Sequence, residues 1–519
     1  MPETAQSASA IADPREERIR DVVIVGGGSA GWMAATMLAT ALSREIRIRL
    51  VESDAIGVVG VGEATIPPIK KFNRFCKVDE QAFLRETNGT FKLGIEFHNW
   101  GRQGDRYLHQ FGFVGRELDA MVKLHHWWLM GRLAGQANYP AWEDVFVAKA
   151  AARANRFALP VRRPNDPLGK FAYAYHFDAL LYGKHLRRLA ESRGVERVEG
   201  TIVDVERADG HEGVRALVLE DGRRIEGDFF IDCSGFRSLL LGEALGEPFD
   251  DWSHWLPADR AMVVPSAPAK DEITPYTKGI AHSVGWQWRI PLQNRIGNGH
   301  VFSSSFSSEG EAEQRLLATL DTEPLDTPRL LKFRTGRRRR AWAGNVLALG
   351  LASGFLEPLE STSIHLVQSG LERLIELFPT RRMDAVLRDR YNAQSEAEWM
   401  QVRDFIIVHY KITQRTDSEF WKYTAAMDIP DSLLAILELW KQRGILGIDG
   451  GHLFQLGSWS SILIGQNFLP QGVHALADRV DPAAVAADIR RIVDEVNRAA
   501  GQLPPHHEFI ARYCAAGAA

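Results

Sequence analysis

The feature that most constrains the fold of this chain is a glycine-rich turn near its N-terminus. The apolar run 21–25 predicts a buried strand, the turn 26–31 (GGGSAG) follows, and the alanine-rich stretch 32–42 predicts a helix. A second strand is expected over residues 46–51, and Glu52 ends it. This succession of strand, glycine turn, helix, strand and acid is the pattern of a dinucleotide-binding βαβ unit.

The residue types in this turn have physical reasons. Gly26 permits the tight turn, Gly28 lets the backbone approach a pyrophosphate, and Gly31 lets the helix pack against the strand. The N-terminus of the helix attracts phosphate charge. Glu52 lies about 20 residues beyond the turn, where an acid contacts the ribose. A purely structural glycine turn is the alternative, but the two flanking strands and the acid favour nucleotide binding.

Bulk composition narrows the class of protein. The 519 residues suffice for two or three domains, and 45% hydrophobic with 25% charged residues is ordinary for a soluble globular enzyme. The net charge of −4 argues against a nucleic-acid partner. No run approaches the roughly 18 to 20 apolar residues of a membrane helix, so no membrane partner is expected.

The cysteines bear on metal binding and on the compartment. Cys76, Cys233 and Cys514 lie far apart, no Cys-x-x-Cys occurs, and the paired histidines lack metal-ligand spacing. No metal is therefore expected. Three cysteines cannot all pair, which suits a reducing cytoplasm, so a cytoplasmic location is the expectation. Residues 1–18 are polar, without an apolar signal core, and are expected to form a loose tail.

Two further segments are informative together. One is 286–291 (WQWRIP), and the other is 62–67 (GEATIP), with Lys71 four residues further on. Behind the glycine fingerprint, the pair resembles the flavin-dependent halogenases, best known as tryptophan halogenases, over residues 22–470. The resemblance implies an enzyme that uses reduced flavin (FADH2), oxygen and chloride or bromide to halogenate an aromatic ring.

The fold class expected is α/β. Segments 227–235 and 345–350 resemble the returning strands of the FAD-binding fold of aromatic hydroxylases and halogenases, which favours FAD over NAD. The resemblance implies a discontinuous, Rossmann-like FAD-binding domain over residues 19–372, with substrate regions interleaved at about 100–170 and 240–330. A helical module over residues 373–519, with helices expected at 395–411, 431–443 and 483–500, would cover the substrate. Residues expected to contact FAD are Gly26, Gly28, Ser29, Ala30, Gly31, Glu52, Gly62, Ala64, Asp232 and Gly350.

The resemblance also assigns the chemistry. Trp286 and Trp288, held by Ile290 and Pro291, would wall off the flavin from the substrate, so that halide attacks the flavin hydroperoxide and gives hypohalous acid. Lys71, nine residues beyond Gly62, matches the family's catalytic lysine and would deliver the hypohalous acid, either hydrogen-bonded or as a haloamine. The adjacent Lys70 is the alternative, but Lys71 fits the spacing better.

A second segment with assigned chemistry is 357–363 (EPLESTS). Glu360 matches the family's essential carboxylate and would polarise the hypohalous acid or take the ring proton, with Ser361 beside it. The backbone N–H groups of Thr362 and Ser363 match the halide site. An acid at the start of a helix is the alternative interpretation of Glu360.

Substrate binding is expected at His109 and Phe111, which resemble the indole-contacting His-x-Phe-Gly segment, and at Trp459. Enzymes acting on free tryptophan carry a tyrosine pair near the C-terminus, and none appears in segment 449–461. A zwitterion needs partners for both its charges. We therefore expect indole-type substrates, halogenated at C3, rather than free tryptophan.

Two other function classes are compatible with the glycine fingerprint. A flavin-dependent aromatic hydroxylase would need open space beside the flavin and no catalytic lysine, and a non-catalytic flavoprotein would need only the fingerprint. The family resemblance further implies a separate flavin reductase as the source of FADH2 and a homodimer as the assembly.

Overall fold

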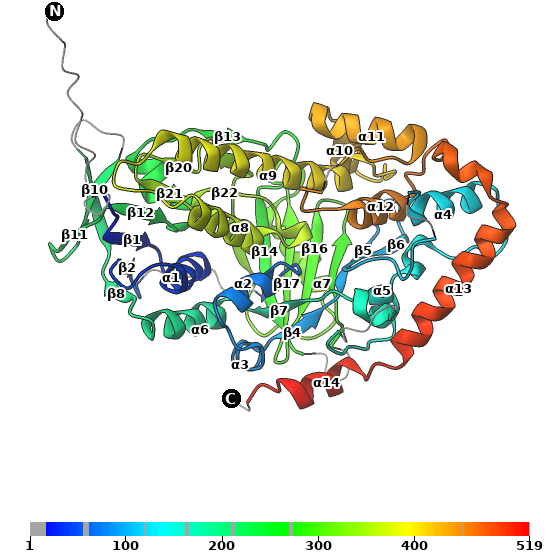
Figure 1. The fold of residues 1–519 in the computed structure, drawn as a ribbon, viewed down its shortest axis with the longest axis horizontal. Coiled ribbons are helices and arrows are strands. Elements are labelled where there is room, and N and C mark those ends of the chain that lie inside the picture. Colours follow the sequence, from blue (N-terminus) through cyan, green and yellow to red (C-terminus); the bar gives the residue numbers. More distant parts are fainter. Residues whose placement is uncertain are drawn as a thin grey trace, which may run out of the picture.

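The computed structural model describes residues 17–55, 62–118, 121–160, 166–208, 213–268, 273–448 and 450–517. Nearly all of the N-terminal tail expected over residues 1–18 lies outside these ranges. Two large sheets stand side by side in Figure 1, and helices cover them. The division into three domains stays a prediction.

A six-stranded sheet contains the glycine fingerprint. Its central strand β1 (Asp21–Val25) pairs in parallel with β2 (Arg47–Glu52) on one side and β12 (Phe229–Asp232) on the other. Strand β21 (Val346–Ala348) pairs in parallel with β12. Both late segments therefore return to the sheet of the first strand, β12 directly beside β1 and β21 one strand further out, as the resemblance implies. The outer strands are β8 (Glu196–Glu199) and β20 (Trp342–Ala343).

The second large sheet has seven strands, and segments far apart in the sequence build it. Strands β5 (Gly94–His98) and β6 (Arg106–Gln110) form an antiparallel pair, and β5 joins β15 (Thr277–Ala281) in parallel. The remaining neighbours are antiparallel and carry the tryptophan segment at their centre. These strands are, in order, β16 (Trp286–Pro291), β17 (Ile296–Phe302), β14 (Arg260–Ser266) and β18 (Arg329–Lys332).

A three-stranded sheet bridges the two large ones. Strand β7 (Ala174–Asp178) pairs with β3 (Gly62–Ala64) on one side and with β4 (Thr90–Lys92) on the other. Strand β3 in turn contacts β16 and β17. This arrangement brings the segment after the glycine fingerprint against the tryptophan strand.

The C-terminal third is helical, as its apolar spacing predicts. Helix α11 (Asp431–Arg443) has the expected bounds, whereas α9 (Ala385–Lys411) begins ten residues before the expected start. At 1.5 Å per residue, α9 is about 40 Å long. It runs beside α8 (Ser363–Glu376) from the six-stranded sheet toward α11 and α12 (Leu456–Gly465) (Figure 1).

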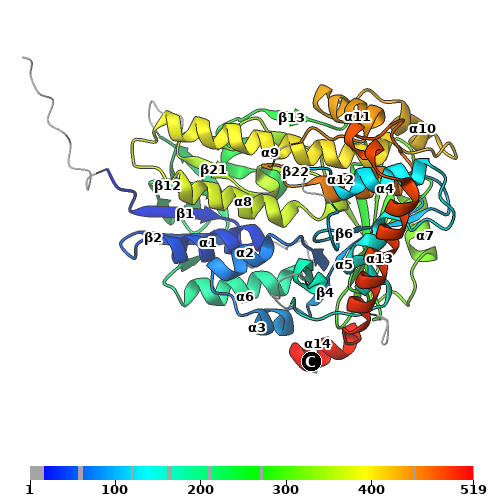
Figure 2. The same ribbon diagram turned by 45° about the vertical axis from the view of Figure 1, so that its right-hand side comes forward.

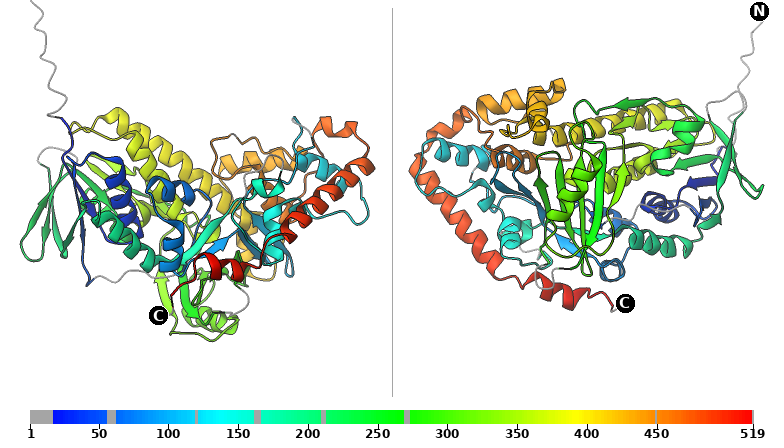
Figure 3. Two further views of the ribbon diagram at one scale, coloured as in Figure 1. Left: turned by 60° about the horizontal axis from the view of Figure 1, so that its bottom comes forward. Right: turned by 180° about the vertical axis from the view of Figure 1, so that it is seen from behind.

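The last helices form the outer edge of the molecule. Helix α13 (Pro482–Gly501) packs on α4 (Leu124–Leu133) and α5 (Val147–Arg153), and it comes to the front in Figure 2. Helix α14 (His506–Tyr513) leads to the C-terminus, which lies near the bottom of both views of Figure 3. The apolar face of α13 explains this placement, since Val485, Ile489, Ile492 and Val496 are buried.

Steric contacts require glycine at two positions of the fingerprint. Gly26 has φ +105°, and a Cβ there would lie 2.3 Å from the carbonyl oxygen of Cys233. A Cβ on Gly31 would lie 1.9 Å from the carbonyl oxygen of Gly26. Gly28, the N-cap of α1 (Ser29–Ala41), has φ −73° and nothing within 4 Å of an added Cβ. The first two glycines are therefore needed for the fold, whereas Gly28 faces open space.

Gly26→Ala should lower the free energy of unfolding by about 2 kcal/mol or more, because it combines a strained φ with a backbone clash. Gly28→Ala is the matched control and should change it by about 1 kcal/mol at most. Denaturant unfolding of the cofactor-free protein, followed by circular dichroism, measures both. Equal losses in the free energy of unfolding for the two variants would contradict the conclusion that the fold requires glycine at Gly26 and not at Gly28.

Candidate active site

The centre of the site is a buried carboxylate held by two histidines. Glu360 ends the 3-10 turn η6 (Pro358–Glu360) and is 0% exposed. One of its oxygens lies 2.8 Å from His109 Nδ1 on β6, and the other lies 2.8 Å from His409 Nε2 on α9. Burial raises the pKa of Glu360, but His109 and then His409 outweigh burial and hold the pKa at about 2. The carboxylate is therefore charged at any working pH.

The partners of His409 fix the orientation of its ring. Its Nδ1 lies 2.8 Å from the carbonyl oxygen of Phe405, which can only accept, so Nδ1 carries a hydrogen. Its Nε2 lies 2.8 Å from the carboxylate of Glu360. Both ring nitrogens are therefore held, one by helix α9 itself and the other by the turn that carries Glu360.

Helix α9 holds both ends of the turn that carries Glu360. His409 binds Glu360, and the hydroxyl of the adjacent Tyr410 donates to Glu357 Oε1 at 2.5 Å. Glu357 is 0% exposed, and burial raises its pKa to about 7. The geometry of the turn thus depends on a helix that begins 25 residues after it.

A buried lysine lies beside this carboxylate. Lys92 ends β4, is 0% exposed and donates from Nζ to Ser361 Oγ at 2.8 Å. Its Nζ lies 5.3 Å from the ring centroid of Phe111. Burial lowers the pKa of Lys92 to about 7, with the negative charge of Glu360 opposing the shift. Ammonium and amine are both accessible to this side chain near neutral pH.

The assignment of Lys71 as the catalytic lysine is wrong. Lys71 lies on α2 (Ile69–Phe75), its side chain is 72% exposed, and its Nζ pairs with Glu372 of α8 at 2.7 Å. This ion pair is on the surface, outside the buried cluster around Glu360. The spacing from Gly62 misled the assignment, because the residues after β3 form helix α2, on which the Lys71 side chain is exposed.

The sequence did contain a signal for Lys92 and His409. Lys92 follows Thr90 and Phe91 in a strand-like run, and a lysine in such a run is seldom buried without a role. His409 stands in the apolar run 405–410 (FIIVHY), within a stretch expected to be helical. A search for charged residues inside apolar runs would have found both.

The turn after Glu360 suits an anion. Ser361 has φ +59°, and α8 begins at Ser363 with Thr362 as its N-cap. The first N–H groups of a helix have no intrahelical acceptor, and the helix dipole favours negative charge there. The hydroxyl oxygen of Thr362 is buried without a hydrogen-bond partner. These features support halide binding at Thr362 and Ser363, which stays a prediction.

The two tryptophans form a buried wall on β16. Trp286 and Trp288 are 1% and 6% exposed, and their ring centroids are 6.0 Å apart. Trp288 lies over Gly299, where a Cβ would come within 2.1 Å of the indole. The tryptophan strand packs closely against Gly62 of β3. A Cβ added at Gly62 would lie 3.5 Å from the side chain of Ile290. In addition, Thr90 of the lysine strand donates to the carbonyl of Pro291 at 2.7 Å.

The expected substrate residues belong to one aromatic cluster. The ring centroids of His109 and Phe111 are 6.5 Å apart, and Trp459 meets Phe405 edge-on at 5.0 Å. Phe405 also stacks on Phe454 at 3.8 Å and lies 5.8 Å from His109. Phe405 and Phe454 are therefore members that the sequence did not indicate. The sequence indicated only substrate contact for His109. In the structure, its Nδ1 also lies within hydrogen-bond distance of Glu360.

The residues around the glycine turn fit FAD. Gly28 faces open space at the start of α1, and Gly350, at φ +62°, would place a Cβ 3.0 Å from Ala30. The side chain of Glu52 lies against the glycine turn. A Cβ added at Gly27 would come within 1.3 Å of the Glu52 carboxylate. Glu52 also accepts from Arg197 at 2.6 Å. Contact of FAD with Ser29, Ala64 and the other expected residues of this group stays a prediction.

Asp232 is placed differently from its expected role. Its carboxylate accepts from the backbone N–H groups of Leu240 and Leu241 at 2.8 and 2.9 Å, and from Ser234. It is 0% exposed. These donors occupy both oxygens, so Asp232 fixes the turn after β12 and has no free acceptor for FAD.

Among the described residues, no group of three or more His, Cys, Asp or Glu side chains is arranged to hold a metal ion. No helix within the described ranges is both long and apolar enough to span a bilayer.

Comparisons with known proteins agree with this geometry. The chain matches the family model described as tryptophan halogenase over residues 21–482. It is 35% identical to tryptophan 7-halogenase RebH of Lentzea aerocolonigenes, over 95% of this chain and 98% of the relative. It is 34% identical to 7-chloro-L-tryptophan 6-halogenase KtzR of a Kutzneria species, over 95% and 99%.

Solved structures give the same result. The flavin-dependent halogenase Xcc4156 from Xanthomonas campestris superposes with a TM-score of 0.92 at 44% identity, over 97% of this chain and 100% of the other. BrvH, a flavin-dependent halogenase from Brevundimonas sp. BAL3, gives 0.91 at 42%, over 96% and 99%. The chain therefore belongs to the tryptophan halogenase family, and it is a flavin-dependent halogenase that uses FADH2, oxygen and chloride or bromide.

Proposed function

We propose that the enzyme halogenates an uncharged, indole-type aromatic substrate, with Lys92 and Glu360 as its catalytic pair. FADH2, oxygen and halide together supply hypohalous acid. The observation that carries the proposal is the burial of both Lys92 and Glu360 at 0% exposure around Ser361, beside the ring of Phe111. A surface lysine such as Lys71 could not keep hypohalous acid away from water.

Lys92 has two ways to act. As an ammonium, it donates a hydrogen bond to the oxygen of hypohalous acid and makes the halogen more electrophilic. As an amine, its nitrogen takes the halogen of hypohalous acid: the bond between halogen and oxygen breaks, and the leaving hydroxide takes a proton from the same nitrogen to become water, which leaves a haloamine. A pKa of about 7 makes both forms available, so the choice between them stays open.

Glu360 completes the substitution. With Lys92 as an ammonium, the ring carbon forms a bond to halogen as the bond between halogen and oxygen breaks, and the leaving hydroxide takes a proton from Lys92 to become water. Glu360 then accepts the proton of the ring carbon. A carboxylate with a pKa of about 2 is a weak base, but the proton of a halogenated cationic ring is very acidic. His109 and His409 are positioning residues that keep Glu360 ionised and directed.

The surroundings of the site favour a substrate without a zwitterion. Phe111, Phe405, Phe454 and Trp459 are aromatic, and the charge of Glu360 is already engaged by two histidines. A bound amino acid would need partners for its ammonium and its carboxylate. Without such partners, indole reacts at C3, its most nucleophilic carbon. Free tryptophan is the alternative, since the relatives RebH and KtzR are named for tryptophan substrates.

Two partners complete the proposal. A separate flavin reductase would supply FADH2, because the chain carries no obvious second nucleotide site for NADH. A homodimer is proposed from the family resemblance alone.

Lys92→Met should lower halogenated product by about 100-fold or more, which is the usual contribution of one positioned proton donor. Lys71→Met is the matched control. Its yield of halogenated product should stay within about twofold of wild type, because an exposed ion pair contributes little to stability. Mass spectrometry of product, with flavin reoxidation followed in parallel, measures both. Loss of activity in Lys71→Met, with full activity in Lys92→Met, would reverse the assignment.

Lys92→Met should also stabilise the cofactor-free protein at pH 6, because wild type must bury an ammonium. The folded-state pKa of about 7 lies below the unfolded value of about 10.4, so between these values the unfolded chain binds more protons. Wild type therefore gains stability as pH rises from 7 to 10, and the advantage of the variant shrinks. Melting temperatures of both proteins between pH 6 and pH 10 test whether the variant is the more stable protein at low pH. A variant that melts below wild type at pH 6 would refute this prediction.

The substrate class is tested by competition. Indole and free tryptophan, with bromide and a flavin reductase, should give mainly halogenated indole. Halogenated tryptophan alone would overturn the substrate proposal and keep the enzyme class. An oxygenated product without halogen would place the catalytic chemistry among the hydroxylases.

A further inference from the structure

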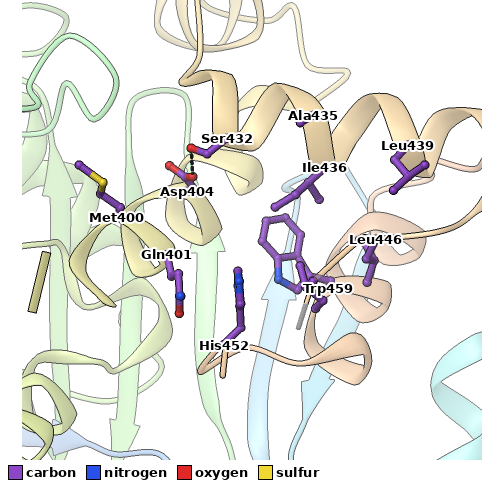
Figure 4. A pocket seen from close by; sticks show the side chains of 12 residues that line it. Met400, Gln401, Asp404, Ser432, Ala435, Ile436, Leu439, Leu446, His452 and Trp459 are labelled. Atoms are coloured by element: carbon purple, nitrogen blue, oxygen red, sulfur yellow. Dashed lines mark hydrogen bonds between the residues drawn. The ribbon is translucent and has the colours of Figure 1, made fainter. Parts of the chain in front are cut away.

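A cavity of about 340 Å³ lies outside the reaction centre, between helices α9, α11 and α12 and the residues 446–448 and 452 (Figure 4). This volume is within the range of about 300–1,000 Å³ that is usual for small-molecule sites. Most of its lining is apolar, and Ile436, Leu446 and Ile448 contribute.

One face of α11 borders the cavity, and most of this face is exposed. Ser432, Ala435, Ile436 and Leu439 line it, at the spacing of one helical face. Ser432, Ala435 and Leu439 are exposed, whereas Leu433, Leu437 and Trp440, on the other side of the helix, are buried. The cavity is thus open to a molecule that comes from solvent.

A thin aromatic wall separates this cavity from the reaction centre. Trp459 lines the cavity and meets Phe405 edge-on at 5.0 Å. Phe405 lies 5.8 Å from His109 and 5.4 Å from His409, the two rings that hold Glu360. Helix α9 accordingly presents Gln401 and Asp404 to the cavity, and Phe405 and His409 to the reaction centre. The cavity and the reaction centre are therefore neighbours, with these two rings between them.

The one carboxylate in the lining already has its partners. Asp404 is 4% exposed; one of its oxygens accepts from Arg403 at 2.8–2.9 Å, and the other accepts from Ser432 at 2.5 Å. Among the described residues that line the cavity there is no lysine or arginine, and His452 is the other titratable side chain. A ligand ammonium would not find a free carboxylate there, and a ligand carboxylate would not find a lysine or arginine, whereas buried charge without a partner is costly. The lining therefore suits an uncharged, apolar group.

We propose that this cavity binds the part of the substrate that is not halogenated, an uncharged aryl or similar apolar group attached to the indole. The inference rests on the proposed function and extends it, because it makes the preferred substrate an indole with an apolar arm rather than indole itself.

The test compares indole with its 5-, 6- and 7-benzyloxy derivatives, which leave C3 free and direct the arm differently. At least one isomer should show a KM about tenfold or more below that of indole. Ala435→Trp fills the cavity from an exposed helix position. It should raise the KM for that isomer about tenfold and leave the KM for indole within about twofold. Glu438→Trp, on the same helix but outside the lining, is the matched control and should change neither.

Calorimetric titration of the FAD-loaded enzyme with the same compounds gives a readout independent of turnover. The Kd should follow the KM, with weaker binding of the preferred isomer in Ala435→Trp only. The inference is overturned if no isomer binds more tightly than indole, if Ala435→Trp has no effect on Kd, or if Glu438→Trp has the same effect. If wild type halogenates no indole, the proposed function fails, whereas selective binding that Ala435→Trp abolishes still supports the cavity assignment.

Discussion

The hydrogen bonds from His109 and His409 to Glu360 are the interaction on which the site depends. A buried carboxylate alone would become neutral, because desolvation raises its pKa. The two histidines reverse that shift, and they come from strand β6 and helix α9, which are 300 residues apart in sequence. The seven-stranded sheet and the C-terminal helices must therefore both be in place before Glu360 is charged and directed.

Lys92 stands in contrast to Glu360. Its ammonium has a hydroxyl acceptor and a nearby aromatic face, but Glu360 is already shared by two histidines and compensates it incompletely. The result is a lysine whose pKa is brought to about 7 at a cost in folding stability. Such a cost is expected where a reactive group is kept in a site that excludes water, which is the role that we propose for Lys92. The stability cost and the proposed reactivity of this residue would have the same physical origin.

Local patterns in the sequence predict the elements around the cofactor well. The β1–α1–β2 unit, the return of β12 and β21 to its sheet, and the bounds of α11 all follow from short apolar runs and glycine positions. The residues of the active site were harder to predict from the sequence, because they come together only through tertiary packing. Spacing along the chain favoured Lys71, yet the pairing of β4 with β7 buries Lys92 instead. Asp232 shows the same limit: a strand-ending acid looks like a ligand for a cofactor until its backbone partners are known.

The arrangement of the aromatic rings connects the chemistry to the choice of substrate. Hypohalous acid is a small and indiscriminate oxidant, so selectivity must come from where it is held and from which ring can approach it. Lys92 and Glu360 are closed off from solvent, whereas the face of α11 beyond Trp459 is open. A substrate that fits both regions would be positioned by its arm while its ring meets the buried pair. Binding energy from a remote group can then be used to orient the reacting carbon, which is how a site without charged anchors can still be selective.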